Sequence, residues 1–169
     1  MSWTIRSSRH DELETLRDIE RSAGGLFRTV GMDDIADHDP FSIDELTEYV
    51  DAGRAWTLTD TEEPVGYALV DVVDDLAHLE QLSVLPAFGR RGYGGQLLTY
   101  VCDWAREHGH AAVTLTTFTD VPWNGPYYER HGFRVLKADD LGPELRALRD
   151  EEAAHGLDPA RRVCMRRDV

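Results

Sequence analysis

The sequence has almost no lysine: Lys137 is the only one among 169 residues, and the formal net charge is −14. Proteins that bind nucleic acid through a broad surface need clustered basic residues to neutralise phosphates. This composition therefore argues against nucleic acid as a partner. A negative surface favours a cationic substrate, but a generally acidic proteome explains the same charge without any role in recognition.

The sequence also has few cysteines and no long apolar segment. Cys102 and Cys164 lack the paired spacing of a redox or zinc motif, so buried free thiols are expected. The histidines show no ligand spacing, and no metal is predicted. No apolar run approaches the length of a membrane span, and the first residues, MSWTIRSSRHDELE, lack the hydrophobic segment of a signal peptide. We therefore expect a cytoplasmic protein with no membrane partner.

What is present is an alternation of strand and helix patterns, which predicts a single domain over residues 1–169. Apolar alternation predicts strands at 3–8, 55–60, 65–73, 76–85, 111–118, 133–137 and 161–167. Helical spacing predicts helices at 10–23, 42–52, 93–108 and 141–155, and a short one that ends at residue 130. Ser42 and Glu45 form a capping box, and residues 24–41 are expected to be a loop with one short turn. The fold class is α/β (α+β), a mixed sheet with helices on it.

A glycine-rich segment lies between a predicted strand and a predicted helix in residues 82–98, LSVLPAFGRRGYGGQLL. Such a turn at a helix start presents backbone N–H groups and partial positive charge to an anion. The dinucleotide fingerprint G-x-G-x-x-G needs a glycine where Leu97 stands. The P-loop needs a lysine and a hydroxyl residue where Gly95 and Gln96 stand. Both of these phosphate-binding motifs are therefore excluded.

A third pattern fits the same segment. It resembles motif A of the GCN5-related N-acetyltransferases, the GNAT superfamily, with Val84 and Pro86 at the strand end and the glycine turn after them. Residues 121–133, VPWNGPYYERHGF, resemble a later motif of this family through Asn124 and the Tyr-Glu-x-x-Gly-Phe run that starts at Tyr128. The resemblance spans roughly residues 3–167. It implies a central mixed, mostly antiparallel sheet of about seven strands, splayed at the acyl-CoA site and flanked by helices.

The resemblance also implies a binding site for acetyl-CoA. The main chain of Leu82, Ser83 and Val84 would bind the pantetheine arm and the thioester carbonyl. Asn124 would bind the pantetheine arm, cap the short helix, or do both. The family's Gln or Arg at the head of the turn falls on Gly89, which displaces the side-chain charge by one position. The turn that would bind the pyrophosphate consists of Gly89, Arg90, Arg91, Gly92, Tyr93, Gly94 and Gly95.

The reaction that the resemblance implies is direct, sequential transfer of an acetyl group to a primary amine, without an acyl-enzyme. Glu80 is the candidate general base, two residues before Leu82, and a solvated strand carboxylate is the alternative. Tyr128 is the candidate general acid that protonates the leaving thiolate, and a core tyrosine is the alternative. His78 lies one alternation from Glu80, so it either lines the acceptor pocket or is merely a neighbour.

The sequence does not name the acceptor, which is a small-molecule or peptide amine. Aromatic residues with carboxylates suit such a group, although core packing explains each of them as well. A longer acyl-CoA, an O-linked acceptor and a non-catalytic acyl-CoA-sensing module are the alternatives. Homodimers are common in the family, and helix 141–155 is a candidate contact or lid. The candidate acceptor residues are Phe27, Trp56, His78, Phe118 and Asp120, with Asp33, Asp34, Tyr67 and Trp123 as further candidates.

Overall fold

The computed structural model describes residues 2–169, which contain seven strands and a set of helices. The strands are β1 (Trp3–Ser7), β2 (Ala55–Asp60), β3 (Glu63–Val73), β4 (Leu76–Val84), β5 (Ala112–Phe118), β6 (Arg134–Val135) and β7 (Arg162–Asp168). The α-helices are α1 (Leu13–Gly24), α2 (Asp33–Ala36), α3 (Ile43–Asp51), α4 (Tyr93–Glu107), α5 (Gly125–Arg130) and α6 (Pro143–Ala154). Short 3-10 turns are η1 (His10–Glu12), η2 (Gly25–Val30), η3 (Pro86–Phe88), η4 (Ala138–Asp140) and η5 (Pro159–Arg161).

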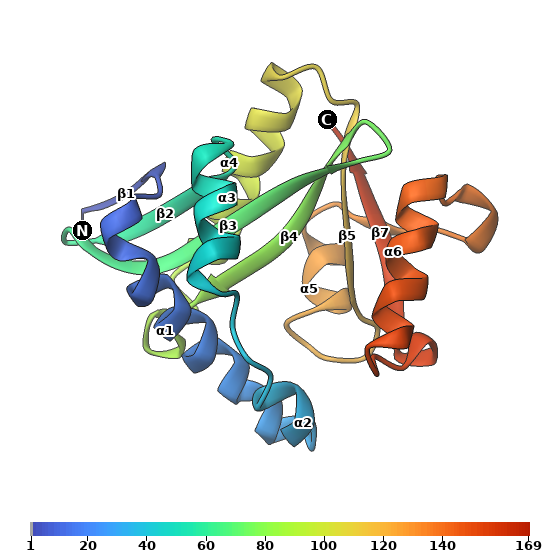
Figure 1. Cartoon of the computed structure of the whole chain (residues 1–169), viewed down its shortest axis with the longest axis horizontal. Helices are drawn as coiled ribbons and strands as arrows, with labels where there is room; N and C mark the ends of the chain where they lie inside the picture. The colour runs from blue at the N-terminus through green and yellow to red at the C-terminus, as the bar shows by residue number, and fades with distance from the viewer. Residues whose placement is uncertain (1) are drawn as a thin grey trace. The chain divides into compact units, whose positions relative to one another are not determined.

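The strands of residues 2–169 form one seven-stranded sheet in the order β1-β2-β3-β4-β5-β7-β6 (Figure 1). The β1–β2, β2–β3, β5–β7 and β6–β7 pairs are antiparallel, and β4 pairs with β5 in parallel. The predicted mixed, mostly antiparallel sheet with flanking helices is therefore confirmed. Within this range of residues, every helix is too short or too polar to cross a membrane.

Most predicted elements agree with the structure to within a few residues, and two differ more. The strand predicted at 133–137 is reduced to the two residues of β6. Residues 24–41 contain two short helical segments, η2 and α2, where one turn was predicted. Gly31, with a positive φ of 73°, ends η2, and an ion pair between Arg28 and Asp37 joins the two segments. Such pairing within a Gly- and Asp-rich stretch has no periodic signal in the sequence.

Contacts between residues divide the chain into two compact units. The first unit comprises Met1–Val70 and Gln81–Val101, and the second comprises Asp71–Glu80 and Cys102–Val169. The division falls inside β3, β4 and α4. The prediction of a single domain over residues 1–169 stays a prediction.

The first unit has its core where α1 and α3 lie side by side against β2 and β3 (Figure 1). The apolar stripes of the two helices are the reason, since spacing of three and four residues places them on one helix face. At the start of α3, the Ser42 hydroxyl accepts a hydrogen bond from the Glu45 N–H, and the Glu45 carboxylate accepts one from the Ser42 N–H. The predicted capping box is thus confirmed. The buried cluster consists of Leu13, Leu16, Ile19, Leu46, Ala55, Tyr67 and Leu69.

In the second unit, the tight turn between β3 and β4 is attached to the start of α6. The Asp74 carboxylate accepts hydrogen bonds from the backbone N–H groups of Glu144 (2.9 Å) and Leu145 (3.0 Å). In return, the Glu144 carboxylate accepts one from the Asp74 N–H. A Cβ on Gly142 would lie 2.3 Å from the Asp74 carboxylate, so a side chain there would displace this carboxylate. This reciprocal cap satisfies N–H groups that lack helical partners and fixes α6 relative to the hairpin.

The parallel contact between β4 and β5 is short. In the residues that the structure describes, its paired positions are Ala77 with Val113 and His78 with Thr114. By contrast, β7 pairs with β5 from Ala112 to Phe118, over the whole strand. Leu79 and Glu80, which follow His78 on β4, therefore lie beyond the positions that pair with β5.

Candidate active site

The turn between β4 and α4, in the first unit, forms the first part of the candidate site. The turn begins where η3 ends, at Gly89, whose N–H donates to the Pro86 carbonyl (3.1 Å). Arg90 and Gly92 have left-handed backbone, with φ of 65° and 79°, and Arg91 separates them. Alternating backbone handedness directs successive N–H groups into one concavity, which is an arrangement that binds anions.

Helix α4 begins at Tyr93, directly after this turn. Its first N–H groups have no acceptor one turn earlier in the helix, and the helix dipole adds partial positive charge at this end. Gly94 and Gly95 follow and carry no side chain that would keep an anion away from the backbone. The turn therefore fits a pyrophosphate group through its main chain, as the sequence predicts.

Two side chains of the turn are directed to the end of β2. The Tyr93 hydroxyl donates to the Asp60 carboxylate, and Arg91 Nη1 lies 3.2 Å from the same Asp60 oxygen. The Arg91 guanidinium also lies over the Phe88 ring, 4.7 Å from its centroid. The hydrogen bond from Tyr93 is the main cause that lowers the pKa of Asp60. These contacts hold the turn in place, whereas Arg90 is exposed to solvent.

The segment Leu82–Val84 forms the last three residues of β4, before the turn. Ser83 is buried, and its hydroxyl accepts a hydrogen bond of 2.7 Å from the Gln81 side chain. On β3, a Cβ at Gly66 would lie 3.0 Å from the Ser83 carbonyl oxygen. Glycine at this position therefore allows β3 to approach the backbone that the sequence assigns to the pantetheine arm.

Two candidate acceptor residues belong to the first unit. Trp56 is 3% exposed and packs against Tyr100, with the ring centroids 5.7 Å apart. Phe27 is half-buried on η2, where its carbonyl accepts a hydrogen bond from Met32. Core packing, the alternative that the sequence left open, therefore accounts for the position of Trp56.

Glu80, the candidate base, lies in the second unit among other ionisable groups. Its side chain is 28% exposed, and its Oε2 lies 3.8 Å from His78 Nε2. Burial is the largest cause that raises the pKa of Glu80 well above its ordinary value of 4.5, and the charges of Asp71 and Glu152 raise it further. Arg162 acts in the opposite direction. The environment thus favours a Glu80 carboxyl group that keeps its proton at higher pH than an exposed glutamate.

A half-buried ion pair between Glu152 and Arg162 also contributes to the electrostatics of Glu80. Glu152, on α6, accepts hydrogen bonds from Arg162 on β7 (3.1 Å) and from the Thr116 hydroxyl on β5 (2.6 Å). Arg162 also donates to the Thr116 hydroxyl (3.0 Å) and covers the Phe118 ring at 4.6 Å. The side chains of Glu152 and Arg162 are 18% and 11% exposed. Each charge is therefore compensated by a partner and by hydrogen bonds, as a buried ion pair requires.

His78 lies on the same strand as Glu80 and is almost completely buried. Its Nδ1 is 2.9 Å from the Thr114 hydroxyl, and its Nε2 is 3.8 Å from Glu80. Burial lowers the pKa of His78 to about 4, so the imidazole is neutral at pH 7. The contact with Glu80 is thus neither a charge pair nor short enough for a hydrogen bond. Among the described residues, no group of three or more His, Cys, Asp and Glu side chains has the arrangement of a metal site.

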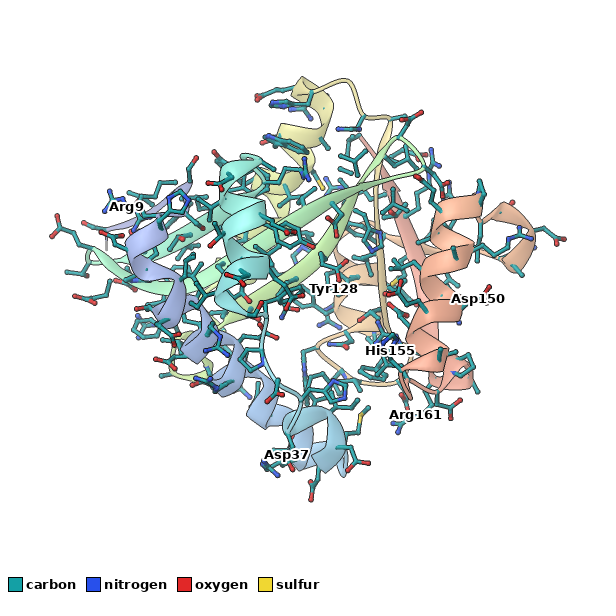
Figure 2. The ribbon with its side chains drawn as sticks, in the orientation of Figure 1. Arg9, Asp37, Tyr128, Asp150, His155 and Arg161 are labelled. Carbon is teal, nitrogen blue, oxygen red and sulfur yellow. The ribbon has the colours of Figure 1, made fainter. Side chains whose placement is uncertain are left out.

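Tyr128 and Asn124, in the second unit, lie at α5, where Figure 2 labels Tyr128. Burial raises the pKa of Tyr128, and its ring packs edge-on against Phe133, with 5.8 Å between centroids. Asn124 occupies the N-cap position of α5 without a capping hydrogen bond from its side chain. Its Oδ1 instead accepts a 3.4 Å bond from the Phe118 N–H, which joins the end of β5 to α5.

Two further acceptor candidates lie at the end of β5 and just after it. Phe118 is 5% exposed beneath the Arg162 guanidinium, and the Asp120 carboxylate lies 3.5 Å from Arg161. Within the second unit the structure thus places His78, Glu80 and Phe118 at one carboxyl-rich network, whereas Asp120 is an exposed surface ion pair.

Sequence reasoning missed four members of this network: Asp71, Thr116, Glu152 and Arg162. One of them had a signal, because Asp71 is a single carboxylate inside the otherwise apolar strand run VGYALVDVV. Glu152 and Arg162 had none, since a glutamate on a polar helix and an arginine in a basic strand are ordinary surface residues. Their pairing depends on the register that places Arg162 opposite Phe118.

Comparison with known proteins agrees with this geometry. Residues 13–133 match the sequence profile of the Acetyltransferase (GNAT) family. Because the match covers more than half of the chain, the protein belongs to this family and is an acyltransferase.

Several solved structures have the same fold. The PaiA N-acetyltransferase of Thermoplasma acidophilum, in complex with coenzyme A, is similar over 100% of both chains, with a TM-score of 0.74 and 16% identity. The ribosomal-protein-S18-alanine N-acetyltransferase of Escherichia coli is similar over 99% of this chain and 94% of its own, with a TM-score of 0.69 and 21% identity.

A third similar structure is a larger protein. The N-acetylglutamate synthase of Neisseria gonorrhoeae, in complex with coenzyme A and N-acetyl-glutamate, matches 99% of this chain, with a TM-score of 0.74 and 19% identity. The present chain spans 35% of the length of that synthase. At these identities the likeness shows the fold, and the acceptor has to be argued from this chain's own residues.

Proposed function

We propose that the protein transfers an acetyl group from acetyl-CoA directly to a primary amine. The observation that carries this proposal is the turn with left-handed Arg90 and Gly92 at the start of α4, in a chain of an acetyltransferase family. Acetyl-CoA supplies the activated thioester when it is bound. The backbone N–H groups of Gly92–Gly95 would bind its pyrophosphate. The main chain of Leu82–Val84 would bind the pantetheine arm and the thioester carbonyl.

Glu80 is the proposed base that removes the proton of the acceptor ammonium. An acceptor amine has to lose this proton before its lone pair attacks the thioester carbonyl. The raised pKa of Glu80 supports the role, because a carboxylate with a higher pKa is a stronger base than an exposed glutamate. Glu80 precedes Leu82 by two residues on β4, so base and thioester-binding backbone are proposed to come from one strand.

Tyr128 is the proposed acid that protonates the leaving thiolate. Its burial raises the pKa of the phenol, so the hydroxyl keeps its proton at neutral pH and is available as a donor. Asn124 is proposed to bind the pantetheine arm through its side-chain amide N–H, since its Oδ1 already accepts from Phe118. As written, this reaction needs no metal ion and no acyl-enzyme.

The names of two similar proteins support an amine acceptor. One is an N-acetylglutamate synthase, which is named for an acetylated amino acid. The other is a ribosomal-protein-S18-alanine N-acetyltransferase, which is named for an alanine of a protein. A net charge of −14 also favours the approach of a cationic acceptor. We therefore propose an acceptor that carries a primary ammonium group, free or at the end of a peptide.

Two experiments test the proposal. In calorimetric titrations at low and high salt, acetyl-CoA is expected to bind, CoA to bind as the product, and NAD and ATP not to bind. A panel of amino acids, peptides and small amines is then screened for acetyl-CoA-dependent release of free thiol, with mass spectrometry of the N-acetyl product. Absence of acetyl-CoA binding at both salt concentrations would contradict the proposal.

A further inference from the structure

Glu20, in the second half of α1, is a half-buried carboxylate that the proposed reaction does not use. Its Oε1 accepts two hydrogen bonds, one from the Tyr67 hydroxyl on β3 (2.9 Å) and one from the Phe41 N–H before α3 (3.0 Å). The two donors belong to separate elements of the first unit. The fold therefore holds this carboxyl group in one orientation.

The second oxygen of this carboxyl group, Oε2, has no hydrogen-bond partner within residues 2–169. In the same part of the chain, no fully buried side-chain oxygen or nitrogen lacks a partner, so Oε2 is accessible to solvent. The two arginines of α1 are directed elsewhere. Arg17 donates its Nε–H to the Phe41 carbonyl (2.9 Å). Arg21 donates to Asp18 (2.9 Å). Helix α1 thus presents an oriented carboxylate oxygen to which no cation is hydrogen-bonded.

Aromatic side chains lie next to this carboxyl group. Phe41 is joined to it through its N–H, and the Phe41 and Tyr49 rings pack edge to face with 6.0 Å between their centroids. Both rings are half-buried and pack against the cluster that contains Tyr67. Aromatic rings attract ammonium groups, and a carboxylate supplies the counter-charge. A single carboxylate oxygen offers too few ligands for a divalent metal ion, so the combination suits an organic cation.

The Glu20 carboxyl group is connected to the backbone that is proposed to bind the thioester. Its partner Tyr67 follows Gly66 on β3, and a Cβ on Gly66 would lie 3.0 Å from the Ser83 carbonyl oxygen. Tyr67 therefore lies beside the segment Leu82–Val84 at the end of β4. All of these residues belong to the first unit. The free carboxylate oxygen is thus one tyrosine side chain away from the strand that would hold the acyl group.

The charges around Glu20 favour a cation. Burial is the largest cause that raises the pKa of Glu20, and the negative charge of Glu45 on α3 raises it further. The hydrogen bonds from Phe41 and Tyr67 and the charge of Arg17 act in the opposite direction. A bound ammonium group would add to this opposing effect, because an opposite charge stabilises the ionised carboxylate.

We propose that Glu20 is a binding residue for the acceptor: its Oε2 pairs with an ammonium group of the amine substrate. This inference rests on the proposed function and deepens it, because it assigns a residue that selects for a cationic acceptor. The reacting ammonium and a second ammonium group of the same acceptor share this chemistry, and kinetics with monoamines and diamines distinguishes them. No covalent bond forms or breaks at Glu20.

NMR of backbone amides tests the site in the protein alone, without acetyl-CoA. n-Butylammonium chloride is titrated at constant ionic strength against sodium chloride, and the Phe41 amide, which donates to Glu20, reports binding. In the wild type its resonance is expected to shift and to saturate. Glu20→Gln keeps an oxygen that accepts both hydrogen bonds but removes the charge, so the saturable shift should disappear. No saturation in the wild type, or the same shift in Glu20→Gln, would overturn the proposal.

The kinetic test measures acetyl-CoA-dependent thiol release with n-alkylamines and α,ω-diaminoalkanes as acceptors. For Glu20→Gln, we expect the KM of the amine to rise about 10-fold or more at nearly unchanged kcat, because Glu20 contributes binding and no chemistry. An increase for diamines alone assigns the second ammonium group to Glu20, and an equal increase for both series assigns the reacting one. An unchanged KM, or a fall in kcat alone, would overturn the proposal.

Glu14→Gln is the matched control, since it removes a carboxylate that is 67% exposed on the same helix. Its Phe41 shift and its KM are expected to equal those of the wild type. An equal rise of KM in both variants would show that the overall negative charge attracts the acceptor, which overturns the role of Glu20.

The NMR titration and the kinetics separate this inference from the proposed function. If Glu20→Gln fails to fold, or if no alkylamine is acetylated, saturation of the Phe41 shift in the wild type decides on Glu20 alone. Absence of thiol release with every amine overturns the proposed function. An unchanged KM in an active enzyme overturns only the role of Glu20.

Discussion

The turn Gly89–Gly95 and the carboxyl network around Glu80 are built in opposite ways. The turn is one contiguous segment with left-handed backbone at Arg90 and Gly92, and its main chain is proposed to bind an anion. The network takes its side chains from β3, β4, β5, β7 and α6. Under the proposed function, this comparison corresponds to a division of tasks: the main chain of the turn is proposed to bind the acyl donor, and the side chains around Glu80 are proposed to control protons.

The largest effect is expected from Glu80→Gln, which removes the proposed base but keeps the shape of the side chain. We expect kcat to fall by about 100-fold or more, within the range typical of general bases. The affinity for acetyl-CoA should be unchanged, because the turn is untouched. Thiol-release kinetics and calorimetry measure the two quantities, with the exposed Glu107→Gln as control. If Glu80→Gln also lost affinity for acetyl-CoA, the proposed division of tasks would be contradicted.

Tyr128→Phe should have the next largest effect. It removes the proposed acid while the ring still packs against Phe133, and we expect kcat to fall about 10- to 100-fold. The matched control is Tyr127→Phe, since this neighbouring tyrosine is also partly buried and has a raised pKa. Steady-state thiol release at saturating acetyl-CoA measures both variants. Equal rates for the two variants would reject the role of Tyr128.

Gly92→Ala tests the other region of the comparison, the turn that is proposed to bind acetyl-CoA. Gly92 has a φ of 79°, and a Cβ raises the free energy of this left-handed backbone by about 1–2 kcal/mol. Because the proposed binding of the pyrophosphate needs this backbone, the acetyl-CoA affinity is expected to fall by about 5- to 30-fold. Gly53→Ala is the control, because Gly53 has a φ of 73° with equal open space around it. Both variants should lose similar stability in urea denaturation, but only Gly92→Ala should lose affinity by calorimetry. Equal acetyl-CoA affinities would show that the turn does not bind the donor.

The cap between Asp74 and α6 should contribute to stability more than to donor binding. Asp74→Asn and Gly142→Ala are each expected to cost about 1 kcal/mol of unfolding free energy, a typical value for a lost helix cap. Because both changes disturb one cap, the double variant should cost less than the sum of the single ones. Urea denaturation of the three variants measures this, and strict additivity would contradict the shared cap.

The smallest effect concerns the pH dependence of stability. Since the pKa of Glu80 is raised by folding, the folded state binds more protons than the unfolded state above pH 4.5. The stabilising contribution of protonated Glu80 is therefore present at low pH and lost as pH rises through the raised pKa. Relative to Glu80→Gln, the wild type should become less stable from pH 4.5 upward, as measured by urea denaturation. A constant difference between the two proteins would argue against the raised pKa.

The sequence allowed the turn to be predicted because its determinants are local. Gly92 is needed for a positive φ, and the helix start and strand end beside it have their own patterns. Most boundaries of helices and strands could be predicted for the same reason, as the Ser42 capping box at the start of α3 illustrates.

The network was less accessible to sequence reasoning because its partners are distant in the chain. Glu80 was predicted from its place on the strand, but Glu152 reaches it through the packing of α6, and Arg162 through the register of β7 with β5. Asp71 was detectable only as a carboxylate in an apolar strand. Burial and nearby charges, which raise the pKa of Glu80, are properties of the tertiary structure. They produce no characteristic residue spacing in the sequence.

One calorimetric experiment tests the division of tasks most directly: titration of acetyl-CoA into the wild type, Glu80→Gln and Gly92→Ala under identical conditions. We predict equal affinity for the wild type and Glu80→Gln, and weaker binding to Gly92→Ala. Equal binding to Gly92→Ala and weakened binding to Glu80→Gln would contradict the account, because the carboxyl network would then hold the donor and the turn would not.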